Sequence, residues 1–270
     1  MTTKAFSIAK FGEQMNEDAV LARPGILAVS DGAGGGGLFA DEWATHLVTM
    51  LPDTPVASFA QLDGWVDSIW EPFYNAFEQR ARQLGGMHLA KFYREGSFAT
   101  LVAIWCSAAD GCRWMAYGDS VAFCYSHRTG LLQHSFTRLA HFNHAPWLIS
   151  CKDPLNAEGF RAGVFDTDES SILFVASDAL AHYIIMMYEL CHRADYADEL
   201  QEALNARTKT SNYVAVGLAL PPFDFESTVV DKLLRLRHNA NFSTHLLSRY
   251  NKGLLALDDY SIAMSWNNDV

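Results

Sequence analysis

Two periodicities of apolar residues run along this chain, and together they predict a mixture of strands and helices. Residues 19–23 and 26–30 lie on either side of Pro24-Gly25, a pattern typical of two strands joined by a turn. Later apolar segments rich in β-branched and aromatic residues predict further strands. These segments are residues 98–106, 113–117, 121–125, 131–136, 171–177 and 260–266.

In other segments apolar residues recur every three or four positions, which predicts amphipathic helices. Residues 40–51 and 59–84 show this spacing first, and Pro72 predicts a kink or break in the second segment before Gly85-Gly86 ends it. The remaining expected helices cover residues 179–190, 197–207, 229–237 and 241–250. Residues 212–220 fit either a strand or a helix, and residues 137–160 predict a surface loop region.

The order of these elements predicts an α+β fold. Strands lie near both ends of the chain and helices come in clusters between them, which differs from the strict alternation of a doubly wound parallel sheet. No stretch has the composition of a linker, so we expect one domain over residues 1–270.

Charge and hydropathy narrow the class of protein. The formal net charge of −11 disfavours binding to nucleic acid, because an acidic surface repels phosphate backbones. No stretch approaches the roughly 18 apolar residues of a membrane span, and the first ten residues lack the apolar run of a signal peptide. We therefore expect a cytoplasmic protein that does not bind membranes.

The cysteines predict neither a disulfide framework nor a zinc ribbon. There are five of them, which is an odd number, and no C-x-x-C pair occurs. Scattered buried thiols in a reducing compartment are the simplest interpretation.

Four acidic residues share one local context, at the end of an apolar strand. Asp31, Asp119 and Asp178 each follow such a segment, and Asp258 precedes one. A carboxylate there is unfavourable unless it is paired, hydrogen-bonded or bound to a metal. Several of them at one pole of a sheet would suit magnesium or manganese, which favour oxygen ligands.

The glycine run that follows Asp31 offers a different interpretation, a phosphate cradle. No Gly-Lys-Ser/Thr comes after it, so it does not fit a nucleotide P-loop, and it lacks a dinucleotide-binding pattern. Glycine here lets the backbone pass close to a metal or ligand.

Six short motifs in order make a resemblance to a known family. They are Asn16-Glu17-Asp18-Ala19, Ser30-Asp31-Gly32, Gly96-Ser97-x-Ala99-Thr100, Gly118-Asp119-Ser120, Ala176-Ser177-Asp178 and Asp258-Asp259-Tyr260-Ser261. This series resembles the metal-dependent protein serine/threonine phosphatases of type 2C, the PPM family. The resemblance implies two stacked antiparallel β-sheets flanked by α-helices on both outer faces. It also implies a site for two Mn²⁺ or Mg²⁺ ions, with a third ion held more weakly.

Carried over by position, the resemblance implies a role for each acidic residue. Asp31 would bridge both metals, the Gly32 carbonyl and Glu17 would bind the second, and Asp178 and Asp258 would bind the first. Asp119 would help Asp178 to hold the third ion, and Asp18 would orient water or ligand. Asp31 and Asp178 would act catalytically through a metal-activated bridging water that hydrolyses phosphoserine or phosphothreonine in a phosphorylated protein substrate. Asp259 is the alternative to Asp258.

Two positions depart from the family pattern. Glu13 stands where members usually carry a phosphate-binding arginine, and Ala33 stands where some carry a histidine. Lys10 or Arg23 are the candidates to replace that arginine. These departures leave two alternatives open: a catalytically weak or inactive binding or regulatory module, and a phosphatase for small molecules.

Overall fold

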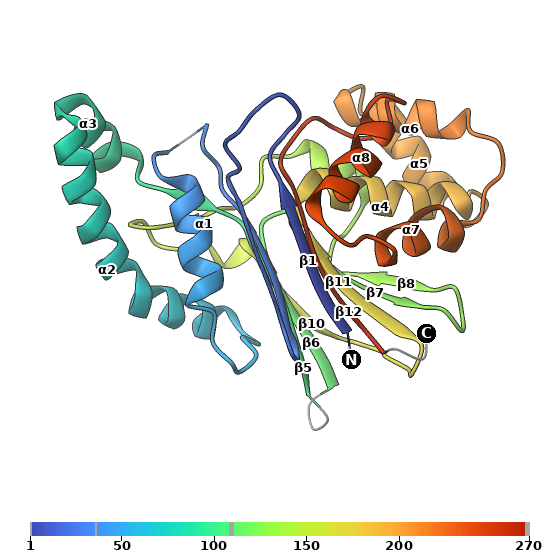
Figure 1. The fold of residues 1–270 in the computed structure, drawn as a ribbon, viewed down its shortest axis with the longest axis horizontal. Helices are drawn as coiled ribbons and strands as arrows, with labels where there is room; N and C mark the ends of the chain where they lie inside the picture. Colours follow the sequence, from blue (N-terminus) through green and yellow to red (C-terminus); the bar gives the residue numbers. More distant parts are fainter. Residues whose placement is uncertain (1, 36, 108–110, 268–270) are drawn as a thin grey trace.

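Two five-stranded antiparallel sheets lie face to face, with helices outside each of them (Figure 1). The computed structural model describes residues 2–35, 37–107 and 111–267. The first sheet has the order β1 (Thr2–Ile8), β12 (Tyr260–Trp266), β11 (Ser171–Ala176), β7 (Val121–Ser126) and β8 (Leu132–His134). The second has the order β10 (Phe160–Phe165), β6 (Gly111–Tyr117), β5 (Leu101–Ser107), β3 (Ile26–Asp31) and β2 (Asp18–Arg23). A short pair joins β4 (Phe98–Ala99) to β9 (Ile149–Ser150).

The helices form two outer layers. The layer beside the second sheet consists of α1 (Ala40–Thr49), α2 (Phe59–Leu84) and α3 (Gly86–Glu95). The layer beside the first sheet consists of α4 (Asp178–Cys191), α5 (Ala197–Asn205), α6 (Lys209–Leu218), the π-helical turn Glu226–Val230, α7 (Asp231–Leu234) and α8 (Asn239–Tyr250). The loop region between β8 and β10 contains the 3₁₀ turns Leu139–Asn143 and Ala157–Gly159.

Three apolar cores hold these four layers together. Small and branched side chains such as Val29, Val102 and Val175 fill the space between the sheets. A second core joins α1–α3 to one sheet, and a third joins α4–α8 to the other. α4 is buried on nearly its whole circumference, because it lies between its sheet and the outer helices. The predicted α+β sandwich with helices on both outer faces is confirmed.

The helix over residues 59–84 forms with the predicted bounds, but Pro72 does not interrupt it. Ser58 caps its first turn by accepting a hydrogen bond from the Gln61 amide. Pro72 lies on the exposed side, where water can hydrate the Ser68 carbonyl that loses its helical partner. Gly85, at φ +111°, ends the helix as expected.

Some elements differ from the sequence-based expectation. β1, α3 and β10 were not predicted, and residues 212–220, which fitted a strand or a helix, are largely helical in α6. The expectation of unpaired thiols is wrong for Cys106 and Cys112, which face each other across β5 and β6 and form a disulfide. Residues directly opposite each other on neighbouring strands lie close enough for a disulfide bond. The spacing of the cysteines along the sequence gave no indication of this pair. Among the helices of the described ranges, none has the length and hydropathy needed to cross a membrane.

Candidate metal centre

The predicted acidic residues come together at one end of the sandwich. Asp31 ends β3 and lies directly opposite Asp18 at the start of β2. Asp119 lies in the turn between β6 and β7, and Asp178 follows β11. Asp258 precedes β12, whose first residue pairs with the last residue of β1. This end is the one away from both chain termini in Figure 1.

Asp31 lies at the centre of this acidic group. Burial and the charges of Asp18, Asp178, Asp119 and Asp258 raise its pKa well above the ordinary value. Its backbone is fixed by Thr100, whose amide donates to the Asp31 carbonyl at 2.8 Å and whose hydroxyl accepts from the Asp31 amide at 3.2 Å. The Thr100 hydroxyl also hydrogen-bonds the buried Ser120 hydroxyl at 2.7 Å. The Gly96–Thr100 motif thus connects Asp31 to the turn that carries Asp119.

Asp178 begins α4 and lies at the positive end of the helix dipole. Its carboxylate accepts a hydrogen bond from the Ala179 amide at 2.5 Å, which favours the charged form. Burial and the charges of Asp119 and Asp258 outweigh this contact and raise the Asp178 pKa well above its usual range.

Asp18 is buried, and its carboxylate lies beside the Ser261 and Ser177 hydroxyls. Burial and nearby carboxylates raise its pKa to about 7, and the neighbouring Ser261 and Ser177 hydroxyls act in the opposite direction. Those two serines are tied together, because the Ser261 amide donates to the Ser177 hydroxyl at 2.9 Å. The Ser261 hydroxyl in turn hydrogen-bonds the Ser7 hydroxyl at 2.7 Å. Asp18 is therefore surrounded by hydroxyl groups that hydrogen bonds link to one another.

The two neighbours Asp258 and Asp259 have different surroundings. The Asp259 carboxylate accepts hydrogen bonds from the Lys10 amide at 2.8 Å and from the Glu17 amide at 2.6 Å, so each of its oxygens is bonded to the backbone. Burial raises the pKa of Asp258, whose charge acts on Asp31, Asp119 and Asp178. Asp258 belongs to the acidic group, whereas Asp259 fixes the loop that carries Glu17.

Glu17 lies beside the glycine run. The Gly34 amide donates to its carboxylate, while burial raises its pKa. The Glu17 carbonyl accepts the Gly32 amide at 3.1 Å. A Cβ at Gly32 would lie 2.6 Å from that carbonyl oxygen and 2.7 Å from the Ala40 carbonyl oxygen, so only glycine fits here. The glycine run thus lets the main chain pass close to Asp31 without intervening side chains.

Arg161 on β10 is a cation that the sequence patterns did not indicate. Its guanidinium donates to the Gly118 carbonyl and opposes the effect of burial on Asp119, whose pKa is raised to about 6. Its Nε atom is buried without a hydrogen-bond partner. Since β10 was not predicted, no sequence signal pointed to this residue. Asp119 is therefore the member of the group with a guanidinium close by.

The two candidate phosphate-binding cations lie in different places. The Lys10 ammonium interacts with Glu13, Asp259, Asp258 and Glu17, so it lies at the acidic end. Its Nζ is 3.8 Å from the exposed Glu13 carboxylate. Arg23, by contrast, ends β2 five residues beyond Asp18, about 17 Å away along the strand. It pairs with Asp53 at 2.7 Å, so the idea that Arg23 serves this site is wrong.

The donor chemistry of this group suits a hard divalent cation. Buried carboxylates that repel one another are stabilised by such an ion. Within residues 2–35, 37–107 and 111–267, no three Asp, Glu, His or Cys side chains are already arranged as a metal-ligand set.

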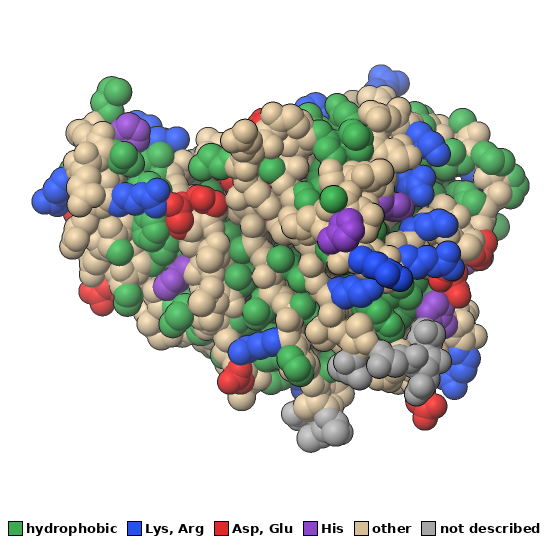
Figure 2. Space-filling model, viewed as in Figure 1, with side chains coloured by type: hydrophobic (Ala, Val, Ile, Leu, Met, Phe, Trp, Pro, Cys, Tyr) green, Lys and Arg blue, Asp and Glu red, His purple; other side chains and the backbone are tan. Residues whose placement is uncertain are grey.

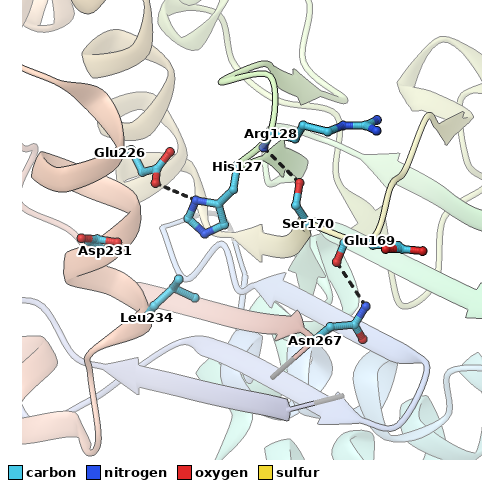
Figure 3. A pocket seen from close by; sticks show the side chains of 8 residues that line it. All are labelled: His127, Arg128, Glu169, Ser170, Glu226, Asp231, Leu234 and Asn267. Atoms are coloured by element: carbon cyan, nitrogen blue, oxygen red, sulfur yellow. Dashed lines mark hydrogen bonds and ion pairs between the residues drawn. The ribbon is translucent and has the colours of Figure 1, made fainter. Parts of the chain in front are cut away.

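A large polar cavity of about 950 Å³ lies elsewhere, at the opposite end of β7. Figure 3 shows His127 turned toward Glu226, with Nδ1 and Oε1 2.8 Å apart. His127 follows β7 whereas Asp119 precedes it, so the two lie more than about 20 Å apart along the strand. This cavity is separate from the acidic group.

Solved structures with a similar fold carry phosphatase names. The serine/threonine phosphatase PstP/Ppp of Mycobacterium tuberculosis has a TM-score of 0.52 and 17% identity, with 99% of each chain covered. A PstP catalytic domain with two manganese ions has a TM-score of 0.53 and 16% identity, covering 97% of this chain and 96% of that one. Stp1 from Staphylococcus aureus has a TM-score of 0.52 and 12% identity, with 98% and 94% covered. No family model matches the sequence, and no curated protein does. These similarities show the shared fold.

Proposed function

We propose that this protein is a metal-dependent phosphatase that hydrolyses phosphoserine and phosphothreonine in proteins. The observation that carries the proposal is the acidic group around Asp31, where the strongest neighbouring charges are other carboxylates. A divalent cation bound here would relieve this repulsion and allow the site to hydrolyse a phosphate ester. The shared fold supports the proposal, since the PstP catalytic domain with that fold was solved with two manganese ions.

The residues that would hold the ions follow from their positions. Asp31 would bind both ions. Glu17 and the Gly32 carbonyl would bind one of them, and Asp178 and Asp258 would bind the other. Asp258 is favoured over Asp259 because both Asp259 oxygens already accept backbone amides.

When bound, two divalent cations supply a water of lowered pKa and neutralise the oxygens of a phosphoryl group. The protein's own groups would orient the water and hold the substrate. Asp18, whose carboxylate lies beside the Ser261 and Ser177 hydroxyls, would accept further hydrogen bonds from water or substrate. Lys10 would attract the phosphate in place of the arginine that Glu13 replaces. Its ammonium is a mobile point charge, so its grip on phosphate is weaker than a bidentate guanidinium's.

A third ion at Asp119 would compete with Arg161. The guanidinium already supplies a positive charge beside this carboxylate. A cation bound by Asp119 and Asp178 would have to displace it or lie beside a like charge, which disfavours binding. We therefore propose a two-ion centre with a weak third position.

The test is phosphate release from a phosphothreonine peptide in the presence of manganese. We expect turnover that EDTA abolishes and that Asp178→Asn reduces by a factor on the order of 10³. A small ester such as glycerol phosphate serves as the comparison, and preference for it over the peptide would indicate a small-molecule phosphatase. Absence of turnover with both substrates, although manganese is bound, would contradict the proposal.

A second candidate function, a binding or regulatory module, is favoured by Glu13. This exposed carboxylate lies beside Lys10 and offsets its positive charge, which weakens any attraction for phosphate. Such a module would bind a protein partner whether or not the acidic group is intact. Partner binding that survives Asp31→Asn, without phosphatase activity in the unaltered protein, would support it, and loss of that binding would exclude it.

A further inference from the structure

The C-terminal helices include a long stretch of sequence without acidic residues. Between positions 232 and 257 the chain contains neither aspartate nor glutamate, although it has 31 acidic residues in total and a formal net charge of −11. The same stretch contains five basic residues, which are Lys232, Arg235, Arg237, Arg249 and Lys252. Lys and Arg side chains accordingly gather on the face over the C-terminal helices (Figure 2). This part of the surface therefore carries positive charge on a protein that is acidic as a whole.

Most of these cations are accessible to an anion from solvent. Lys232, Arg237 and Lys252 are exposed, and in the part of the chain that the structure describes none of the three forms an ion pair. Arg235 pairs with Asp231 at 3.1 Å, but its side chain is 71% exposed. An exposed pair of this kind contributes little stability, so Arg235 can also turn toward a bound anion.

The fold adds a further cation from the other end of the chain. The Lys4 ammonium on β1 donates to the Leu234 and Leu236 carbonyls at 2.8 Å each, which holds it at the C-terminal end of α7. Burial and the charge of Arg237 lower the pKa of Lys4, so these two cations lie near each other. We call the set of Lys4, Lys232, Arg235, Arg237 and Lys252 the basic surface.

The positive charges also extend from α7 to α8. Burial and the charges of Arg249 and Lys232 lower the pKa of His245 to about 4. His245 is therefore neutral at pH 7, while the two cations beside it repel each other. Like charges that the fold holds close together favour the binding of an anion.

An apolar hollow borders the basic surface. Its volume is about 140 Å³, and Met187, Phe223 and Leu254 form much of its wall. Thr228 also lines it and lies four residues before Lys232 in the same helical stretch. A dry apolar cavity of about 150 Å³ in another protein accommodates benzene, so this hollow has room for one aromatic or branched side chain.

We propose that the basic surface and the hollow together form a docking site for an acidic protein segment with one apolar side chain. The apolar side chain would fill the hollow, and carboxylates on either side of it would lie over Lys232, Arg235 and Arg237. A long nucleic acid would extend beyond the basic surface and be repelled by the rest of this acidic molecule. A lipid headgroup by itself would leave the hollow empty.

The docking site is separate from the acidic group and goes beyond the proposed function. β1 ends at Ile8, which pairs with Tyr260 at the acidic end of the sandwich. Lys4 lies four residues before Ile8, about 13 Å along the strand. Binding at the basic surface thus needs no metal ion, and it can be measured with the metal centre emptied by EDTA.

The test is fluorescence anisotropy of the full chain in EDTA, with a labelled peptide of eight glutamates around one central phenylalanine as the probe. We expect saturable binding that weakens by roughly tenfold or more from about 50 to about 300 mM salt, because exposed charges are screened. The same peptide with serine in place of phenylalanine should bind several-fold more weakly, since the hollow then stays empty. Glutamines in place of the glutamates should abolish binding.

Two matched pairs of substitutions locate the binding. Lys232→Glu combined with Arg237→Glu should weaken binding of the phenylalanine peptide by roughly tenfold or more. Lys91→Glu combined with Arg94→Glu makes the same change in net charge on α3, in the other helical layer, and should change the affinity by less than about twofold. All four side chains reach the surface, so both variants should fold, which circular dichroism and a melting curve would verify.

Absence of saturable binding of the phenylalanine peptide would overturn the proposal. Equal weakening by the two pairs of substitutions would do so too, because it would show an effect of net charge alone. Equal affinity for the phenylalanine and serine peptides would contradict the role of the hollow. Tighter binding of oligothymidine or of phosphatidylserine vesicles than of the peptide would overturn the assignment to a protein partner.

Discussion

At the residue scale, the acidic group is a set of like charges that the fold places close together. Asp18 and Asp31 face each other across two strands, and directly opposite like charges destabilise a sheet. The sequence indicated these residues because each carboxylate lies at the end of an apolar strand. It could not indicate Arg161, because its strand was not predicted. It favoured Asp258 over Asp259 only by resemblance, and the backbone amides bound by Asp259 add a physical reason for that choice.

Removal of one of these charges should stabilise the metal-free protein. We expect Asp31→Asn to raise the free energy of unfolding in EDTA by roughly 1–2 kcal/mol, because it relieves repulsion among buried carboxylates. Urea unfolding followed by circular dichroism measures this change. Asp53→Asn, at an exposed carboxylate, is the control and should change stability by less than about 0.5 kcal/mol. A less stable Asp31→Asn protein would contradict the repulsion described here.

Lys10 and Arg23 offer a second residue-scale test, since both were candidates for the phosphate contact. Lys10→Gln should raise the KM for a phosphothreonine peptide by roughly tenfold, because a charge-assisted contact to phosphate is lost. Steady-state kinetics with manganese measures this change. Arg23→Gln should leave KM unchanged, since Arg23 lies at the far end of β2. Equal KM values for Lys10→Gln and the unaltered protein would show that Lys10 does not bind phosphate.

At the element scale, long periodic segments were predictable and short or polar ones were not. α2 has the predicted bounds because its spacing, its Ser58 cap and its final glycine agree. β10 was missed because Phe160–Phe165 contains arginine and glycine and exposes Ala162 and Val164 at the sheet edge. α3 was missed because it begins directly after the glycine that ends α2. The helix is continuous through Pro72, where a break was one of the two expectations, and the proline lies on the exposed side.

α4 carries a buried acid that predicts a pH dependence of stability. Burial raises the pKa of Glu189 to about 8 from its ordinary 4.5. Between these values the folded state binds more protons than the unfolded state, so the free energy of unfolding falls as the pH rises from 4.5 to 8. Glu189→Gln should remove this loss and stabilise the protein at pH 8 by on the order of 3 kcal/mol.

Urea unfolding at pH 5 and pH 8 measures the effect of Glu189→Gln, with little difference from the unaltered protein expected near pH 5. Glu71→Gln, on the exposed side of α2, is the matched control and should change stability by less than about 0.5 kcal/mol at either pH. A gain in Glu189→Gln that is the same at both pH values would contradict the linkage.

At the scale of the whole molecule, the fold explains why distant motifs meet. Both sheets are antiparallel, so strand ends that lie far apart in sequence share one pole of the sandwich. The acidic group occupies the pole away from the termini, and the Cys106–Cys112 disulfide lies toward the other end of its sheet. The motifs could be recognised in sequence, but their convergence depends on strand order, which hydrophobic patterns do not specify.

The central claim is that this acidic group is a hydrolytic metal centre. The most direct measurement is hydrolysis of p-nitrophenyl phosphate with manganese, with EDTA, and for Asp31→Asn and Asp178→Asn. We predict turnover that requires manganese and falls by a factor on the order of 10³ in both variants, while each stays folded. Turnover that persists in EDTA or in both variants would place the activity elsewhere, and no turnover despite bound manganese would contradict the claim.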